Sequence, residues 1–443
     1  MIKSKISIYS LITFFHIALF GYLKNGLYEI FSLGNENINF FIKIILSLLI
    51  IIFLLILVKK NSHLLKSYNL DKLDKIFLIF IIPFSLNYFI SYYLDYKISN
   101  LKNIYFLLIF ALIFLILRFV SISIKKPNKN ILFLFSSWFL FLLFFLKIFS
   151  KGDIFSTSAN PISLVFYIVY VWILANENKP INKIFNFMIF LCIFYLLDSK
   201  FFIIFSIFAL IFSFKKLRYF DVKKLFFLFI TLYFLVNLIF PSLILKKYPE
   251  IRNTNIDFVQ TFYECKIIIG EEALKGDKFL KKHFSYEDIK YCLNIEKNDL
   301  IMRHLLNYDQ YYDHFSFIYS AGYRFMHIFE VYNYSQKNYY LPYFLSYSDL
   351  VKLNKADNII KQSTPHNSFA IILLRLGFPG LILIFYFFYK IISYRGRVYN
   401  SYYKYNLLIL LGYFSLNDQL FFHNFIASLF FWFFCTQIVY KNN

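Results

Sequence analysis

Charged residues are scarce in this sequence of 443 residues. They make up 16% of the chain, whereas hydrophobic residues make up 59% and aromatic residues 23%. A water-soluble domain does not hide that much apolar surface, but a lipid bilayer accepts it. The low charge and the apolar excess together exclude an ordinary soluble protein.

The alternating ten-residue segments of a transmembrane β-barrel are also missing. Instead, apolar runs long enough to cross roughly 30 Å of hydrocarbon recur along most of the chain. Backbone amides in lipid must bond within their own segment, so such runs form helices. We predict an all-α, polytopic integral membrane protein with about twelve transmembrane helices. The predicted spans lie near residues 6–23, 39–58, 76–94, 104–123, 131–149, 162–175, 184–198, 201–214, 225–245, 367–389, 405–416 and 420–439.

No small-residue cleavage site follows the first apolar run, so we predict that this helix is retained. The spans divide the chain into three parts: an N-terminal transmembrane bundle over 1–245, a loop domain over 246–365, and C-terminal transmembrane helices over 366–443. The loop holds 16 basic and 15 acidic residues and has helical patterns that mix aromatic with polar residues. It is predicted to be either a small helical domain or a set of helices along the membrane surface.

Acidic residues number 25 against 47 basic ones, a formal net charge of +22. The basic residues gather in alternate short loops rather than along one stripe, which argues against nucleic-acid binding. One set of loops and both ends of the chain hold 22 of them, while the short loops on the other side hold six. The positive-inside rule then predicts cytoplasmic termini and places the loop domain on the outer side.

Cysteine is rare, with four residues, and no Cys/His cluster has metal-ligand spacing. Cys192 and Cys435 fall in predicted spans, where they are interpreted as packing residues. Cys265 and Cys292 both fall in the outer loop, where an oxidising compartment makes them candidates for a disulfide. No Asp-x-Asp element occurs in an outer segment, which agrees with a metal-independent mechanism. No cofactor is expected.

Charges within the predicted spans are few. Lys43 and Arg118 lie near span ends, where their side chains can reach the interface. Arg375 lies about nine residues, or roughly 13 Å, into the tenth span. A charge at that depth is either a functional residue or a structural partner for a polar group on another helix.

The most informative stretch runs from Ser363 to Gly380, where the chain re-enters the membrane. Pro365 ends the loop, and Asn367 or Ser368 can cap the new helix. His366 is therefore predicted beside a helix N-terminus, which favours the neutral imidazole, able to accept a proton from a hydroxyl. Gly377 and Gly380 are predicted to allow close approach of another helix.

His366-Asn367, followed by nine residues, Gly377, two residues and Gly380, resembles the signature of the O-antigen ligase and polymerase superfamily. Weaker similarities to this superfamily extend over most of the chain. Asn160-Pro161 is similar to the family's Asn-Pro element, and Ser199-Lys200 stands where a Ser-Arg pair is frequent. Ser320 to Arg324 resembles its Ser-Gly-Arg entry to a loop helix. The Pro-Leu-Phe-Gly-rich stretch usual beyond that helix is missing.

This resemblance implies a glycosyltransferase of the bacterial inner (cytoplasmic) membrane whose active site faces the periplasm. The donor would be a glycan on undecaprenyl pyrophosphate, and the acceptor lipid A core, another glycan repeat or a protein. Arg324 is the first candidate for the pyrophosphate and for catalysis, with Lys200 and Arg303 next, because cations neutralise the leaving group. His366 would activate the acceptor hydroxyl. The His-Asn spacing and the single dominant loop favour a ligase, with a repeat-unit polymerase as the alternative.

Two readings from other classes stay open. A lipid-linked oligosaccharide flippase also has about twelve spans, but short loops, inverted repeats and several intramembrane charges would be expected of it. A non-catalytic scaffold would leave the position of His366 unexplained. The second His-Asn pair, His423-Asn424, lacks the downstream glycine and is interpreted as structural.

Overall fold

The computed structural model describes residues 70–95, 98–119, 159–197, 199–214, 221–239, 367–394, 400–415 and 425–439, with shorter pieces at 52, 59, 133–134, 136–141, 143–144, 331–332, 335, 338–339 and 341–342. Within these residues every regular element is a helix, so the all-α prediction is confirmed there. The predicted spans at 6–23 and 39–58, apart from residue 52, and nearly all of the loop domain lie outside the described residues.

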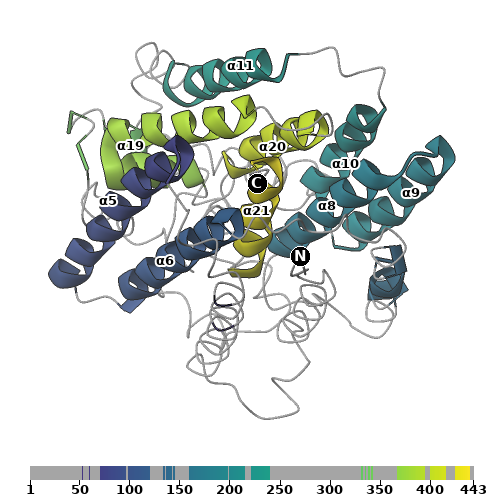
Figure 1. The fold of residues 1–443 in the computed structure, drawn as a ribbon, viewed down its shortest axis with the longest axis horizontal. Coiled ribbons are helices and arrows are strands. Elements are labelled where there is room, and N and C mark those ends of the chain that lie inside the picture. Colours follow the sequence, from purple (N-terminus) through teal and green to yellow (C-terminus); the bar gives the residue numbers. More distant parts are fainter. Residues whose placement is uncertain are drawn as a thin grey trace, which may run out of the picture.

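The described helices follow the predicted spans closely (Figure 1). They are α5 (Lys72–Asp95), α6 (Ile98–Phe119), α8 (Ala159–Asn176), α9 (Pro180–Leu196), α10 (Lys200–Ser213), α11 (Val222–Phe234) with a short π-helix (Leu235–Ile239), α19 (Ser368–Ser393), α20 (Asn400–Phe414) and α21 (Phe425–Ile438). The agreement has a simple cause, because an apolar run of lipid-spanning length has one way to satisfy its backbone.

Figure 1 shows two groups of helices joined by the C-terminal pair. The helices α5, α6 and α19 pack together on one side, and α8, α9 and α10 on the other. Between them, α21 contacts both α6 and α8, and α20 contacts α10, α11 and α8. The C-terminal helices therefore bind together segments that are far apart in the sequence.

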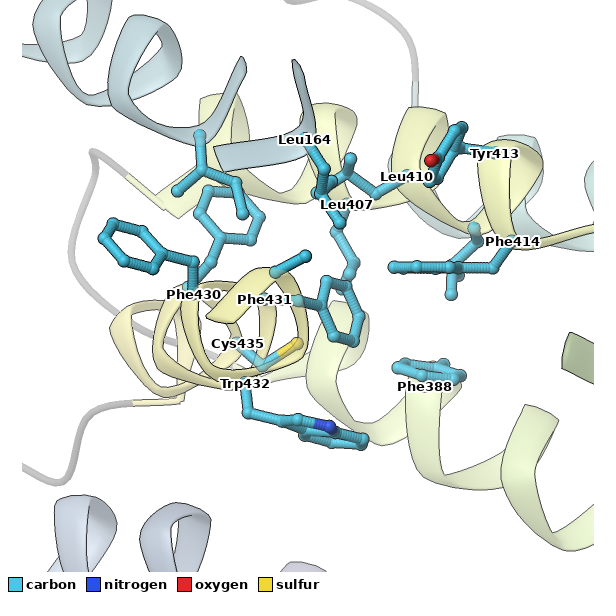
Figure 2. Packing of buried hydrophobic residues seen from close by; sticks show 14 of the residues in the cluster. Leu164, Phe388, Leu407, Leu410, Tyr413, Phe414, Phe430, Phe431, Trp432 and Cys435 are labelled. Carbon is cyan, nitrogen blue, oxygen red and sulfur yellow. The ribbon is translucent and has the colours of Figure 1, made fainter. Parts of the chain in front are cut away.

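Aromatic side chains fill the centre of this arrangement. Figure 2 shows Phe431 of α21 between α19 and α20, with its ring centroid 6.3 Å from that of Phe388 and 4.6 Å from that of Phe414. Trp432 and Cys435 are fully buried beside them. Offset and edge-to-face rings stabilise such contacts beyond their area. Cys435 is thus a packing residue, as predicted.

The outward faces of several helices are apolar. In α9 the exposed residues Ile181, Phe185, Met188 and Tyr195 recur at helical spacing. The helix α5 repeats the pattern with Ile79, Ile82, Leu86 and Phe89. Such continuous apolar faces are typical of a surface that lipid covers.

Two of the described helices, Lys72–Leu94 and Ser368–Ser393, are long and apolar enough to cross a membrane. Four shorter apolar helices accompany them, at Asn103–Ile116, Ile162–Asn176, Pro180–Leu196 and Lys200–Ser213. Length and composition therefore point to membrane association, while the full number of twelve spans stays a prediction.

Arg118 is placed differently from the prediction. It does not reach outward, because its side chain is fully buried and pairs with Asp74 and with Asp71, the latter at 2.7 Å. Asp71 precedes α5 and accepts from the Asp74 N–H, while the Asp74 carboxylate accepts from the Asp71 N–H. This reciprocal pair resembles a capping box. The start of α5 therefore supplies two carboxylates that hold the last turn of α6.

Two lysines join helix ends in the same manner. Lys404, at the start of α20, donates its ammonium to the Tyr394 carbonyl at 2.5 Å, where α19 ends. Burial, together with the charge of Lys223, lowers the pKa of Lys404. Lys183, at the start of α9, donates to the Ser213 carbonyl at 2.6 Å, where α10 ends. A cation at a helix C-terminus is favoured by the helix dipole.

Candidate functional site

The predicted site residues divide into two sets. His366, Arg324, Arg303, Cys265 and Cys292 lie outside the described residues. The structure does describe Lys200, Asn367, Ser368, Arg375, Gly377 and Gly380. Asn160 and Pro161 fall in the first turn of α8.

Asn367 begins the re-entry helix. It is the N-cap of α19, and its side-chain oxygen accepts from the Ala370 N–H at 2.8 Å. This bond satisfies one of the amide groups that a helix start leaves open. The side-chain amide donates to the Ser415 carbonyl at 2.5 Å, just past the end of α20. The prediction of a cap at Asn367 or Ser368 is confirmed at Asn367, which also ties α19 to α20 immediately after His366.

A pair of tyrosines stands beside this cap. The hydroxyl of Tyr332, from the loop domain, donates to the hydroxyl of Tyr233 in α11 at 2.7 Å. The Asn367 side chain also lies beside Tyr233. All three side chains are buried. Three segments far apart in the sequence therefore meet at the residue that follows His366.

Lys200 lies near the Asn367 cap, because the start of α10 packs against the end of α20. It is exposed and opens α10. Two residues on, the Phe202 ring packs against Tyr413 of α20, with centroids 4.9 Å apart. Tyr413 lies two residues before Ser415, the partner of Asn367. The starts of α10 and α19 thus flank the same end of α20, so the structure brings the neighbourhoods of Lys200 and Asn367 together.

Arg375 lies two turns further into α19 and faces α5. Its guanidinium donates to the Ser91 hydroxyl at 2.6 Å and to the Asn87 side-chain oxygen at 3.3 Å. The guanidinium carbon also lies 4.4 Å from the centre of the Tyr88 ring, a cation–π contact. Arg375 is 5% exposed. Of its two predicted readings, these contacts support a structural partner for polar groups on another helix.

Just beyond Arg375 the helix breaks. Gly377 has φ 68° and ψ −168°, a conformation essentially confined to glycine. The helix carries Pro379 two residues later, which has no N–H to give to the Arg375 carbonyl. The Asn87 side-chain amide takes that place and donates to the Arg375 carbonyl at 2.7 Å. The Asn87 side chain therefore accepts a hydrogen bond from the Arg375 guanidinium and donates one to the Arg375 carbonyl.

The two motif glycines have a local role that the sequence did not predict. Gly377 supplies the backbone break. A side chain at Gly380 would place its Cβ 2.1 Å from the Cβ of Leu376. That residue is in the same helix, one turn back across the break. The spacing of the two glycines thus fits the local shape of α19.

We expect Gly377→Ala to destabilise the protein by about 1–3 kcal/mol, because a Cβ is strained at this φ and ψ. Gly412→Ala is the matched control, since Gly412 lies inside α20 and a Cβ there meets nothing within 4 Å. Alanine is favoured over glycine within a helix by roughly 0.5–1 kcal/mol. Thermal unfolding of detergent-purified protein should show a lower midpoint for Gly377→Ala only. Equal midpoints for the two variants would contradict the assigned role of Gly377.

No group of His, Cys, Asp and Glu in the described part of the chain could hold a metal ion. Comparisons with models of protein families, with curated proteins and with solved structures found no match to this chain.

The sequence did not reveal Tyr233, Tyr332, Asn87 or Ser91 as members of the site. Tyrosine is common here, with 38 residues, so single tyrosines attract no attention. Asn87 and Ser91 carried a usable signal, because they are polar, four residues apart and inside an apolar run, so they share one helix face.

Proposed function

We propose that this chain is a multi-pass membrane glycosyltransferase of the O-antigen ligase type. It transfers a glycan from undecaprenyl pyrophosphate to an acceptor hydroxyl on the periplasmic side of the bacterial inner membrane. The observation that carries the proposal is the spacing from His366-Asn367 to Gly377 and Gly380. Within this motif, the structure describes a buried N-cap at Asn367 and a helix break at Gly377.

The proposed reaction needs no metal or cofactor. The acceptor oxygen attacks the anomeric carbon of the donor sugar while the bond from that carbon to the pyrophosphate oxygen breaks. His366 takes the proton of the acceptor hydroxyl, and undecaprenyl pyrophosphate leaves. Arg324, with Lys200 and Arg303, neutralises the charge that develops on the leaving group.

The arrangement of the site supports this assignment of roles. A general base must be held at a fixed place. Asn367, the residue next to His366, is fastened to the end of α20 by its side-chain bond to the Ser415 carbonyl, and its side chain lies beside Tyr233 of α11. The Tyr332–Tyr233 bond brings the loop domain to that point, eight residues after Arg324 in the sequence. Lys200 lies at the neighbouring helix start and is exposed, as a phosphate ligand must be.

Contacts at the helix ends support the proposed alternation of the spans. Three contacts join helix ends that the charge pattern assigns to the cytoplasm. They are the ion pairs of Arg118 with Asp71 and Asp74, the bond from Lys404 to the Tyr394 carbonyl, and the bond from Lys183 to the Ser213 carbonyl. Asn367 and Ser415 join two ends assigned to the outer side. Every one of these contacts agrees with a single alternation of the spans.

Deletion of the gene followed by electrophoresis of surface polysaccharide tests the proposal. A ligase deletion leaves lipid A core without polymer, while polymer stays on the lipid carrier. Core that bears a single repeat would identify a polymerase instead. Unchanged glycans with altered transport of another compound would favour a transporter and reject the transferase.

We expect Tyr233→Phe to lower transfer more than Tyr332→Phe, because the Tyr233 hydroxyl accepts from Tyr332 and also lies beside the Asn367 side chain. Loss of one such bond costs about 0.5–1.5 kcal/mol, or roughly two- to tenfold in rate if it positions the base. Tyr339→Phe is the control, since Tyr339 is 86% exposed in the same stretch of the loop domain. Transfer per molecule of membrane-inserted protein is the measurement. Normal transfer in Tyr233→Phe would remove these tyrosines from the site.

A further inference from the structure

Two lysines converge on one hydroxyl where α5 begins and α19 ends. The Tyr386 hydroxyl of α19 lies beside the side chains of both Lys72, the first residue of α5, and Lys390. The Lys390 ammonium also lies 5.0 Å from the centre of the Tyr386 ring and 5.9 Å from that of Tyr389. Lys72 is exposed and Lys390 is half-buried. Two ammonium groups with one shared neighbour repel each other, and an anion between them would remove that repulsion.

No carboxylate pairs with these two lysines in the part of the chain that the structure describes. Asp71 and Asp74, which lie at the same end of α5, both pair with Arg118. The loops that lead into α5 and out of α19 offer none in their sequence. Residues 59–70 and 395–404 contain lysine or arginine but neither aspartate nor glutamate. The counterion for the lysine pair must therefore come from outside these segments.

Exposed apolar side chains continue from both lysines along the two helices. In α19, Ile382, Tyr386 and Lys390 follow one another at intervals of four residues and share one face. In α5, Ile79 lies two turns after Lys72 on the same face. Ile382 is 52% and Ile79 58% exposed. Since α5 and α19 pack side by side (Figure 1), their common surface is cationic at one end and apolar behind it.

We propose that an anionic phospholipid binds between α5 and α19, on the side that the charge pattern assigns to the cytoplasm. Its phosphate lies between Lys72 and Lys390 and accepts a hydrogen bond from the Tyr386 hydroxyl. Its acyl chains lie along the face that holds Ile79 and Ile382. Basic sites between transmembrane helices on this side bind acidic headgroups. A zwitterionic headgroup is disfavoured, because its own cation would face the two lysines.

The proposed lipid would join the two helices at a second place. The Asn87 side chain bonds both the carbonyl and the guanidinium of Arg375, midway along α5 and α19. A phosphate shared by Lys72 and Lys390 would hold the start of α5 to the end of α19. This end of α19 is the one opposite to the cap at Asn367. The lipid site therefore does not rest on the proposed function.

Acetylation of lysines measures occupancy of the site in the native chain. Delipidated full-length protein in detergent is treated with an acetylating reagent, and the rate at each lysine is followed by peptide mass spectrometry. At ten times its Kd, dioleoylphosphatidylglycerol should slow acetylation of Lys72 and Lys390 by about tenfold, with one midpoint for both. Lys179 and Lys224, which are exposed on the same predicted side, should react at nearly their original rates. Dioleoylphosphatidylcholine and inorganic phosphate should protect none of the four.

Variants matched in charge provide the second test. The double variant Lys72→Gln with Lys390→Gln removes the site, whereas Lys179→Gln with Lys224→Gln removes the same charge elsewhere on that side. Dioleoylphosphatidylglycerol should raise the thermal unfolding midpoint of the native chain and of the second double variant, but not of the first. Tyr386→Phe should weaken binding by about two- to tenfold, the effect of one hydrogen bond. If the first double variant does not accumulate, acetylation of the native chain decides.

Several results would overturn this proposal. Equal slowing of acetylation at all four lysines would mean a diffuse attraction to the whole basic side. Equal protection by dioleoylphosphatidylcholine would remove the need for an anionic headgroup, and equal protection by inorganic phosphate would remove the lipid. Unchanged acetylation of Lys72 and Lys390, or an equal rise in midpoint for both double variants, would reject the site. Neither assay involves glycan transfer, so failure of the proposed function would leave the expected results unchanged.

Discussion

Replacement of His366 by alanine should abolish transfer of surface glycan while the protein still inserts into the membrane. A general base contributes about 10²- to 10⁴-fold to a rate, so a loss of at least roughly a hundredfold is expected. The adjacent Asn367 caps α19 with its own side chain, so we expect this helix to begin normally without the imidazole. Complementation of the deletion strain, read by polysaccharide electrophoresis and by the amount of protein in the membrane, measures both effects.

The chain offers a matched control in its second His-Asn pair. His423→Ala removes an imidazole from the same dipeptide, without the downstream glycine. This variant should transfer glycan at close to the normal level. Wild-type glycan in the His366→Ala strain would remove the enzyme assignment. A complete loss in both strains, at normal protein levels, would deny His366 its special role.

Arg118→Met should produce the largest loss of stability among the described residues. Asp74 is fully buried, and its carboxylate would lose the guanidinium that neutralises it. Removal of one partner from a buried ion pair typically costs about 3–5 kcal/mol, because the other charge stays buried. The midpoint of thermal unfolding in detergent should fall accordingly, and the yield of inserted protein with it.

Two further variants separate the ion pair from a general effect of charge. Lys75→Met removes a cation from an exposed position in the first turn of α5 and should change stability by less than about 0.5 kcal/mol. The double variant Arg118→Met with Asp74→Leu removes the guanidinium and the fully buried carboxylate, leaves only the partly exposed Asp71 carboxylate, and should recover much of the loss. If the single and double variants unfold at the same temperature, the buried carboxylate is not the cause.

The sequence predicts the helices well because one-dimensional patterns decide them. An apolar run of lipid length forms a helix wherever it occurs, and α5, α6 and α19 lie close to the predicted spans. The cap at Asn367 was predictable for the same reason, since proline, a capping residue and an apolar run follow one another locally. Predictions of this kind need no knowledge of which helices are neighbours.

Pairings between helices could not be predicted in this way. Arg375 was identified from its depth, yet its partners Asn87 and Ser91 lie 288 and 284 residues away in the chain. The Arg118 side chain was predicted to reach the membrane interface because Arg118 lies near the end of a span. Only the packing of α5 against α6 brings Asp71 and Asp74 to it. Hydrophobic periodicity indicates which face is buried but not what covers it.

The hydrogen bond from the Asn87 side chain to the Arg375 carbonyl of α19 has a consequence for biosynthesis. The ribosome completes Asn87 288 residues before the carbonyl to which its amide will donate. At a synthesis rate of about 5–20 residues per second, α5 waits on the order of 15–60 s for that partner. During this interval its polar face must be shielded by water, by lipid headgroups or by an insertion factor. Nascent chains that end before α19 should therefore be more readily degraded than the finished protein.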